Sequence, residues 1–231
     1  MKKEIYFFSN AGGTIELFNG LCNELEQQFD CFPFEYPGHS SDRNGFCDSI
    51  EKLSKAAYIF FTKRHKLGAE FVLMGYSMGT IVAMELNKLI KDNNKTTPIG
   101  IVLAADPPRN MIIEENGKLE EENIKAFYMK NGGISEKLIN SKLFIHMYLP
   151  SFRNDYLILK RYDYSKMNRN NTMKSVILYC EQDTPYEIMS EWASFFISKP
   201  LFIQYSGGHF FLRDHYQEIA QIIIKTFLSE K

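Results

Sequence analysis

The sequence FVLMGYSMG, residues 71–79, decides how this chain is expected to fold. Phe71–Met74 is apolar and of strand length, and a helix-like stretch follows the last glycine directly. Between them, the pattern G-x-S-x-G places Ser77 on a tight turn that lifts its hydroxyl above the end of a sheet. Side chains at Gly75 and Gly79 would collide across such a turn, so both positions must be minimal. The strand, the turn and the helix together predict a nucleophilic serine.

Short apolar runs alternate with helix-like stretches along most of the chain. The expected strands are Ile5–Phe8, Cys31–Tyr36, Phe71–Met74, Ile99–Ala104, Val176–Cys180 and Leu201–Tyr205. The expected helices are Ile15–Phe29, Phe46–Lys66, Met78–Lys91, Tyr186–Ile197 and Leu212–Leu228. Nearly continuous apolar strands are typical of a sheet that helices cover on both faces. This alternation predicts an α/β fold with a mostly parallel, doubly wound sheet.

The interval 107–173 interrupts the alternation, because it contains no clear strand. Its helix-like parts are Leu119–Lys130, Ser135–Leu149 and Phe152–Tyr162. The sequence Asn131-Gly132-Gly133 would end the first of them. We expect a helical lid that caps the carboxyl edge of the sheet, inserted within one domain of residues 1–231.

The overall composition fits a folded domain and excludes several classes of protein. Of 231 residues, 45% are hydrophobic and 24% charged, and the formal net charge is −1. Binding to nucleic acid or to a membrane surface needs a basic excess or patch, so we expect neither partner. No apolar run has the length of a membrane span or of a secretory signal. We therefore expect a cytoplasmic protein whose four scattered cysteines are reduced thiols.

Two later loops contain candidates for the base and the acid that would serve Ser77. The chain order serine, acid, histidine is typical of hydrolases with this strand–turn–helix. Asp183 follows the strand Val176–Cys180 and His209 follows the strand Leu201–Tyr205, so both reach the edge where the serine lies. His209 would accept the serine proton, and Asp183 would hold the imidazole tautomer and stabilise the imidazolium.

Two other carboxylates compete with Asp183 for the role of the acid. Glu181 lies two residues earlier in the same loop. Asp106 follows the strand Ile99–Ala104 and therefore reaches the same edge, and some hydrolases of this fold take their acid from that earlier strand. We favour Asp183 and keep Asp106 as the alternative, since an unused carboxylate would order a loop or cap a helix.

A tetrahedral intermediate needs two N–H donors. One is expected from Met78, directly after the nucleophile, and the other from the loop Ser9–Thr14 after the first strand. The glycines of this loop allow close approach to a ligand, so Ala11 or its neighbour Gly12 is the expected donor.

The remaining histidines, His39, His65, His146 and His215, are weaker candidates for chemistry. His215 lies six residues after His209, which is not a helical metal-ligand spacing. His65 lies in the charged helix end KRHK and is expected to be solvated. We therefore expect no metal site.

Together these motifs resemble the type II thioesterases that accompany nonribosomal peptide and polyketide synthases, and they cover nearly the whole chain. The matching segments are Phe8-Ser9-Asn10-Ala11-Gly12-Gly13 (F-P-x-A-G-G), Tyr36-Pro37-Gly38-His39 (P-G-R or P-G-H), Gly75–Gly79 (G-H-S-M-G), Asn131–Gly133 in the lid, Asp183-Thr184-Pro185 and Gly207–Leu212 (G-G-H-F-F-L). The last is the most specific. Ser9 replaces the usual proline, Tyr76 replaces the usual elbow histidine, and the family seldom needs an acid at Asp106.

The resemblance implies the α/β-hydrolase fold and the hydrolysis of acyl or aminoacyl thioesters from the phosphopantetheine arm of a carrier protein. Such enzymes clear misprimed or stalled groups from a synthase. Ser77 would attack the thioester, the pantetheine thiol would leave, and water activated by His209 would release the acid. The arm is then part of the substrate, so no cofactor is expected. A small-molecule esterase or acyltransferase of the same fold is the alternative, and a binding protein without catalysis is a third interpretation.

Side chains of the lid could contact such a substrate. An acyl or pantetheine channel could be lined by Phe127, Tyr128, Met129, Phe144, Met147, Tyr148 and Phe152, although such residues more often pack a lid onto its domain. An acidic carrier protein could bind to four basic side chains, Lys160, Arg161, Lys166 and Arg169. Such charges more often simply lie on a surface that faces solvent.

Overall fold

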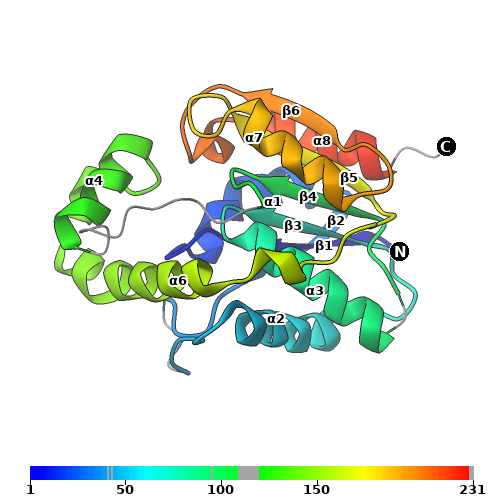
Figure 1. Ribbon diagram of the computed structural model, residues 1–231, viewed down its shortest axis with the longest axis horizontal. Coiled ribbons are helices and arrows are strands. Elements are labelled where there is room, and N and C mark those ends of the chain that lie inside the picture. Colours follow the sequence, from blue (N-terminus) through cyan, green and yellow to red (C-terminus); the bar gives the residue numbers. More distant parts are fainter. Residues whose placement is uncertain (41, 43, 95, 109–119, 229–231) are drawn as a thin grey trace.

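A parallel sheet of six strands forms the centre of the computed structural model (Figure 1). The structure describes residues 1–40, 42, 44–94, 96–108 and 120–228. The strands are β1 (Lys3–Phe8), β2 (Phe29–Phe34), β3 (Phe71–Tyr76), β4 (Gly100–Ala104), β5 (Lys174–Cys180) and β6 (Leu201–Tyr205). Their order across the sheet is β2-β1-β3-β4-β5-β6, and every neighbouring pair is parallel. The predicted α/β fold is confirmed.

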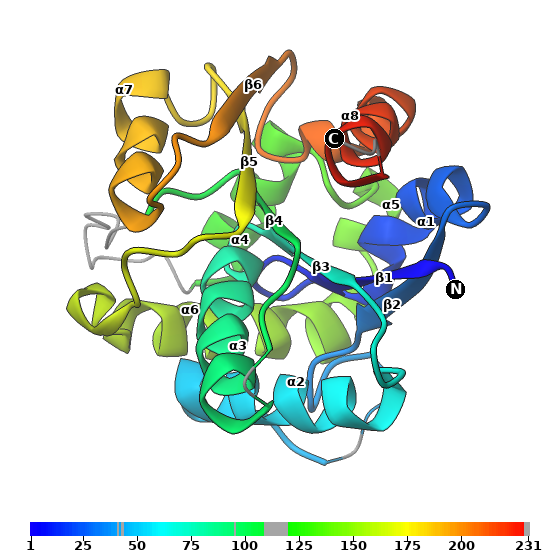
Figure 2. The same cartoon turned by 90° about the vertical axis from the view of Figure 1, so that its right-hand side faces the viewer.

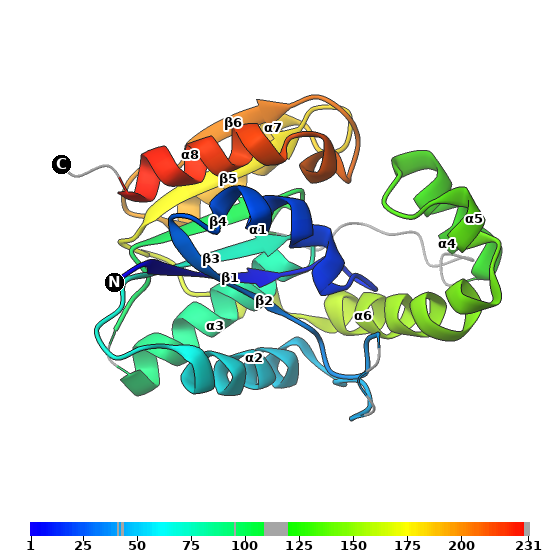
Figure 3. The ribbon, with the colours of Figure 1, turned by 180° about the vertical axis from the view of Figure 1, so that it is seen from behind.

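Helices cover both faces of this sheet, as Figures 2 and 3 show from two sides. One face carries α2 (Ile50–Arg64) and α3 (Gly79–Asn94), which pack against each other. The opposite face carries α1 (Asn19–Leu25) and α8 (Tyr216–Leu228), which also pack against each other. The sheet is therefore doubly wound, as its continuous apolar strands predict.

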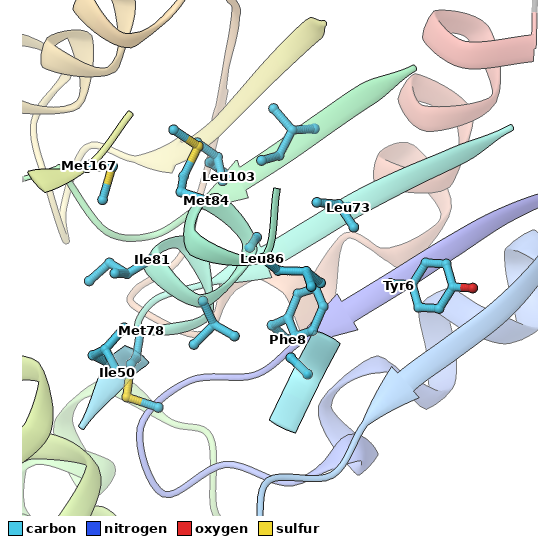
Figure 4. Close-up of a cluster of buried hydrophobic side chains, with 14 of the residues drawn as sticks. Tyr6, Phe8, Ile50, Leu73, Met78, Ile81, Met84, Leu86, Leu103 and Met167 are labelled. Carbon is cyan, nitrogen blue, oxygen red and sulfur yellow. The ribbon is translucent and has the colours of Figure 1, made fainter. Parts of the chain in front are cut away.

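The two helical layers bury alternate residues of the same strands. On β1, Tyr6 and Phe8 point into the core under α2 and α3, whereas Ile5 and Phe7 point into the core under α1 and α8. Figure 4 shows the first of these cores, in which Leu73 of β3 lies among side chains of α3. Successive strand residues face opposite sides, so a strand buried on both sides is apolar at nearly every position.

Several predicted elements are shorter or divided in the structure. The first predicted helix is a 3-10 turn at Ile15–Phe18 followed by the short α1. The stretch after β5 forms α7 (Tyr186–Met189), beside that strand, and a 3-10 segment, Ser190–Phe195. Another 3-10 turn, Phe211–Asp214, precedes α8. The strand β2 ends at Phe34, just before the Tyr36–His39 turn, and as an edge strand it tolerates a proline at position 33.

The described part of the predicted lid is helical. It contains α4 (Glu121–Asn131), α5 (Glu136–Ile139), a π-helical turn (Phe144–Tyr148) and α6 (Leu149–Arg161), followed by a 3-10 turn at 164–166. In Figure 1, α4 and α6 lie beside the ends of the strands rather than on a face of the sheet. The start of the first predicted lid helix lies outside the described residues. None of the helices in the described ranges is long and apolar enough to cross a membrane.

The direction of winding changes between β1 and β3. From β1 the chain continues to β2 on one side, and it then returns to β3 on the other side of β1. In open α/β sheets, ligands bind beyond the carboxyl ends of the strands at such a switch point. The loops that follow β1 and β3 therefore mark the place where a functional site is expected.

We predict that Leu73→Ala lowers the free energy of unfolding by about 2–5 kcal/mol, because it leaves a cavity in the centre of the sheet. Leu67 is 100% exposed, so Leu67→Ala should change that free energy by less than about 0.5 kcal/mol. Urea unfolding of both variants measures the difference. Equal losses would contradict the assignment of β3 to the core.

Candidate active site

Ser77 lies on a strained turn between β3 and α3. Its φ is 52°, in the left-handed region that residues with a side chain rarely adopt. A Cβ atom on Gly75 would overlap the carbonyl of Gly79, and one on Gly79 would overlap the carbonyl of Phe8. Both glycines of the G-x-S-x-G pattern are therefore required by close backbone contacts, and the second contact holds the turn against the end of β1.

The structure brings Ser77, His209 and Asp183 into one chain of hydrogen bonds. The distance from Ser77 Oγ to His209 Nε2 is 3.1 Å, and that from His209 Nδ1 to Asp183 Oδ2 is 2.9 Å. A carboxylate only accepts, so Nδ1 carries a proton and Nε2 is able to accept the serine proton. The side chains of His209 and Asp183 are 12% and 16% exposed, so the chain is mostly shielded from water. This geometry fits a nucleophile, its base and an orienting acid.

Tyr76 positions the loop that carries His209, a role that the sequence did not indicate. This fully buried residue donates from its hydroxyl to the backbone carbonyl of His209 at 2.6 Å, and it accepts from the Leu212 N–H at 3.4 Å. It stands beside Ser77 in the elbow, where the related motif usually has histidine. That departure from the motif was the only available signal, and it did not reveal the contact.

The surroundings of His209 favour its protonated form. Burial opposes the imidazolium, but the hydrogen bond to Asp183 and the charges of Asp183 and Asp106 outweigh this effect, so the pKa of His209 is raised above 6.5. An imidazole with a raised pKa is a stronger base once it is neutral. The pair with Asp183 therefore increases the basicity that a serine hydrolase needs.

Asp106 lies near this chain without joining it. It is 6% exposed, and its Oδ2 atom has no hydrogen-bond partner among the residues that the structure describes. Burial raises its pKa to about 7, with the charge of His209 acting in the opposite direction and that of Asp183 adding to the rise. Its backbone carbonyl accepts from Trp192 Nε1 at 2.8 Å. The other competing carboxylate, Glu181, accepts from the backbone N–H of Tyr186 at 3.3 Å, as a loop-ordering group does.

The two expected oxyanion donors lie on loops that touch each other, since the Gly79 backbone lies against Phe8 at the end of β1. Within the described residues, the N–H groups of Ala11 and Met78 donate no hydrogen bond. The N–H of Gly12 differs, because it donates to Asp155 Oδ2 at 2.8 Å. The N–H of Gly12 is thus already hydrogen-bonded in this structure, and Ala11 stays the predicted donor of this loop.

A cavity of about 250 Å³ opens beside the candidate site. Its walls come from the loop after β1, from the lid and from the segment after His209: Asn10, Gly12, Gly13, Thr14, Glu16, Leu17, Tyr128, Gly133, Ile134, Ser135, Leu138, Tyr148, Phe210 and Arg213. Ser77 is not part of the wall, but Gly12 and Phe210 each adjoin a candidate site residue. The cavity therefore lies next to the hydrogen-bonded chain rather than over it.

The lid aromatics divide into different roles. Tyr128 and Tyr148 line the cavity, whereas Phe144 is fully buried and Met129 is 61% exposed. The ring of Phe127 packs edge-on against His209, with a centroid distance of 5.7 Å. Only part of the predicted channel lining is therefore in a position to meet a ligand.

The basic residues proposed to face a partner already have neighbours. Lys166 pairs with Asp163 at 3.6 Å, and Arg169 stacks over the ring of Phe195. Both are on the surface. The structure gives no feature that singles out these residues for binding.

The prediction that His65 is solvated is wrong. Its Nδ1 atom lies 2.7 Å from the Oε2 atom of fully buried Glu4, and its ring stacks on Phe61. Glu4 Oε1 also accepts from the backbone N–H of Lys66 at 3.0 Å. The charged sequence around His65 hid this pairing, because its partner lies on a distant segment. Among the described residues, no three His, Cys, Asp or Glu side chains are grouped so that they could hold a metal ion.

Comparisons with known proteins place this chain in a family. A family model described as "Thioesterase domain" matches residues 3–227. Phenyloxazoline synthase MbtB of Mycobacterium tuberculosis is 25% identical over 224 residues, which are 95% of this chain and 16% of that protein. The chain thus spans only 16% of the length of this curated relative.

Solved structures show the same fold. ClbQ from the colibactin NRPS/PKS pathway has a TM-score of 0.87 at 21% identity, and the match covers 98% of this chain and 97% of that one. The type II thioesterase BorB from the borrelidin biosynthetic cluster has a TM-score of 0.84 at 21% identity, covering 97% and 92%. The fold is that of the α/β-hydrolase class. The chain belongs to the thioesterase domain family, and the family resemblance of its motifs is confirmed.

We predict that Asp183→Asn lowers kcat by about 10³–10⁴-fold, because an amide in place of the carboxylate favours the wrong imidazole tautomer. Asp106→Asn should lower kcat far less, since its carboxyl forms no hydrogen bond with His209 in this arrangement. Steady-state kinetics of both variants on one acyl thioester make the comparison. The reverse order of losses would assign the acid to the loop after β4.

We also predict that kcat/KM falls as the pH drops through an apparent pKa above 6.5, because only neutral His209 accepts a proton. The ionised form of Asp106, whose own pKa is about 7, raises the pKa of His209. Asp106→Asn should therefore move the acidic limb of the pH–rate profile to lower pH. An unchanged limb in this variant would show that the charge of Asp106 does not reach the base.

Proposed function

We propose that this chain hydrolyses acyl or aminoacyl thioesters from the phosphopantetheine arm of carrier proteins, and that it edits misprimed nonribosomal peptide or polyketide synthases. The observation that carries the proposal is the hydrogen-bonded chain of Ser77, His209 and Asp183 in a member of the thioesterase domain family. The lid beside the carboxyl edge supports it, because a helical lid encloses a long substrate arm. The fold shared with a type II thioesterase supports it as well.

The reaction follows from the geometry in two steps. Ser77 Oγ attacks the thioester carbonyl while its proton passes to His209 Nε2, and the N–H groups of Ala11 and Met78 stabilise the oxyanion. The C–S bond then breaks, and the thiol leaves with the proton that His209 returns. A water molecule next gives its proton to His209 and attacks the acyl-serine, which releases the acid and restores Ser77. Asp183 keeps the imidazole oriented throughout.

The partner in this proposal is a carrier protein, and the phosphopantetheine arm belongs to the substrate. No cofactor takes part in the two steps, because the nucleophile, the base and the donors all come from the chain. We place the reaction in the cytoplasm, where reduced thiols such as the four free cysteines persist.

We predict that the wild-type chain hydrolyses acyl thioesters on a phosphopantetheinylated carrier protein, and that Ser77→Ala lowers kcat by about 10⁶-fold. The affinity for the carrier protein should stay unchanged, because the substitution removes only the nucleophilic oxygen. The measurements are release of the free acid and binding titration. Ser165→Ala, at an exposed serine, is the matched control and should behave like the wild type.

The same assay separates this proposal from an esterase or an acyltransferase of the same fold. Simple esters and carrier-bound thioesters are offered in parallel, with and without an acceptor alcohol or amine. Ester turnover without thioester turnover would contradict the proposal. Absence of Ser77 labelling by a covalent serine probe would instead indicate a protein without catalysis.

A further inference from the structure

A second histidine–carboxylate pair, fully buried, contacts the loop after β1. His39 Nε2, from the turn after β2, is 2.8 Å from Asp155 Oδ2 of α6. Their side chains are 2% and 1% exposed, so this pair is more deeply buried than that of His209 and Asp183. The side-chain hydrogen bonds of His39 and Asp155 go to each other, to Pro37, to Gly12 and to Asn154 rather than to Ser77, and the two-step reaction above does not use either residue.

Asp155 joins the pair to the loop after β1, Ser9–Thr14, which contains Ala11 and is called the oxyanion loop below. Its Oδ2 atom also accepts the backbone N–H of Gly12 at 2.8 Å, directly after Ala11. One turn earlier on α6, the backbone of Phe152 lies so close that a Cβ atom on Gly12 would come within 2.8 Å of the Phe152 Cβ atom. Gly12 also has a φ of +67°, which favours glycine. The helix α6 thus holds the loop by backbone packing and by a carboxylate.

The hydrogen bonds around His39 fit a charged pair. Its Nδ1 atom lies 3.2 Å from the carbonyl oxygen of Pro37, and its Nε2 atom faces Asp155. The Pro37 carbonyl accepts, and an ionised Asp155 accepts as well, so beside a carboxylate the ring satisfies both contacts as an imidazolium that donates twice. The resulting imidazolium–carboxylate pair supplies Asp155 with the counter-charge that a buried carboxylate needs.

The groups packed around the pair agree with this assignment. Burial opposes the charge on His39, but the hydrogen bond and charge of Asp155, the Pro37 carbonyl and the charge of Glu35 outweigh it, so the pKa of His39 is raised. The other titratable groups that sense the negative charge of Asp155 are uncharged in their ordinary state: Tyr36, Cys47 and Tyr128. The second oxygen, Asp155 Oδ1, is 3.4 Å from the amide nitrogen of Asn154.

We propose that Asp155, with His39 as its counter-ion, is a positioning residue that holds the oxyanion loop so that the N–H of Ala11 points to the reacting carbonyl. The proposal rests on the function proposed above only in that Ser77 forms a tetrahedral intermediate. Asp155 accepts the N–H of Gly12, so the preceding N–H, that of Ala11, is the one in this loop that is left to bind a substrate oxygen. Two tyrosines hold the same loop, since Tyr36 donates to the Ser9 carbonyl at 2.7 Å and Tyr128 to the Ala11 carbonyl at 3.4 Å.

Because Asp155 belongs to α6, the pair also couples the position of this lid helix to the geometry of the oxyanion hole. Asn154 of the same turn donates to the carbonyl of Cys47 at 3.0 Å, which fixes α6 to the segment before α2. A shift of this helix would pull on Gly12 and displace the N–H of Ala11. Displacements of about 1 Å in such groups cost about 10²-fold in rate.

The test is Asp155→Asn, which keeps the shape of the side chain and removes its charge. We measure kcat and KM on an acyl-N-acetylcysteamine thioester, and the inhibition constant of a trifluoromethyl ketone whose tetrahedral adduct places an oxyanion in the hole. Both kcat/KM and the affinity for the ketone should fall together by about 10–100-fold, mostly through kcat. Losses of less than twofold in both quantities would overturn the proposal.

The chain offers a matched control at the opposite end of the sheet. Glu4 also accepts from a histidine ring, that of His65, and from a backbone N–H, that of Lys66, and it is fully buried. Glu4→Gln should therefore lower the free energy of unfolding as Asp155→Asn does, while kcat and the affinity for the ketone stay unchanged. If both variants lost activity and ketone affinity equally, Asp155 would have only a structural role, and the proposal would fail.

A second variant covers the case in which Asp155→Asn does not fold. His39→Gln keeps a donor toward Asp155 and removes the positive charge, so a smaller parallel loss in kcat/KM and ketone affinity is expected. A loss of stability without that parallel loss would overturn the proposal. Since a small thioester and a ketone are the probes, failure of the chain to act on any carrier protein would contradict the proposed function and leave this comparison intact.

Discussion

The site depends on the contact between the start of α3 and the end of β1. Glycine at position 79 lets the α3 backbone lie against the carbonyl of Phe8, and glycine at position 75 lets the turn close over it. This contact places Ser77 beside the loop that follows β1, at the point where the winding of the sheet reverses. A nucleophile and its oxyanion donors must lie within about 3 Å of one carbonyl group. The other features of the site therefore depend on this backbone contact.

Two histidine–carboxylate pairs, one partly buried and one fully buried, lie near the loop after β1 and have opposite consequences. His209 faces a hydroxyl that donates and a carboxylate that accepts, so its ring can stay neutral and act as a base. His39 faces two acceptors, so its ring stays charged and has no proton acceptor to offer. The same two residue types thus provide a reactive group on one side of the loop and a fixed support on the other. The lid contributes to both sides, through Phe127 against His209 and through Asp155.

Prediction from the sequence succeeded where the signal was local. The strand–turn–helix around Ser77 and the six-residue motif Gly207–Leu212 could be recognised from the sequence, because glycine spacing and apolar runs reflect nearby backbone geometry. Prediction failed where the partner is distant in the chain. His65 was expected to be solvated, although it pairs with fully buried Glu4 and its own side chain is 15% exposed. The sequence also gave no sign that the N–H of Gly12 donates to Asp155. Helix ends also shifted, because tertiary packing rather than propensity decides them.

The sequence by itself determined the class of sheet, the serine on its elbow and the order in which acid and base follow it. These features depend on residue type and on spacing along one strand or turn. Only the tertiary structure distinguished Asp183 from Asp106, since both follow strands that end at the same edge and only Asp183 is hydrogen-bonded to the ring of His209. A hydrogen bond forms only when the donor and acceptor atoms are positioned to within a few tenths of an ångström. The packing of the whole fold sets these positions.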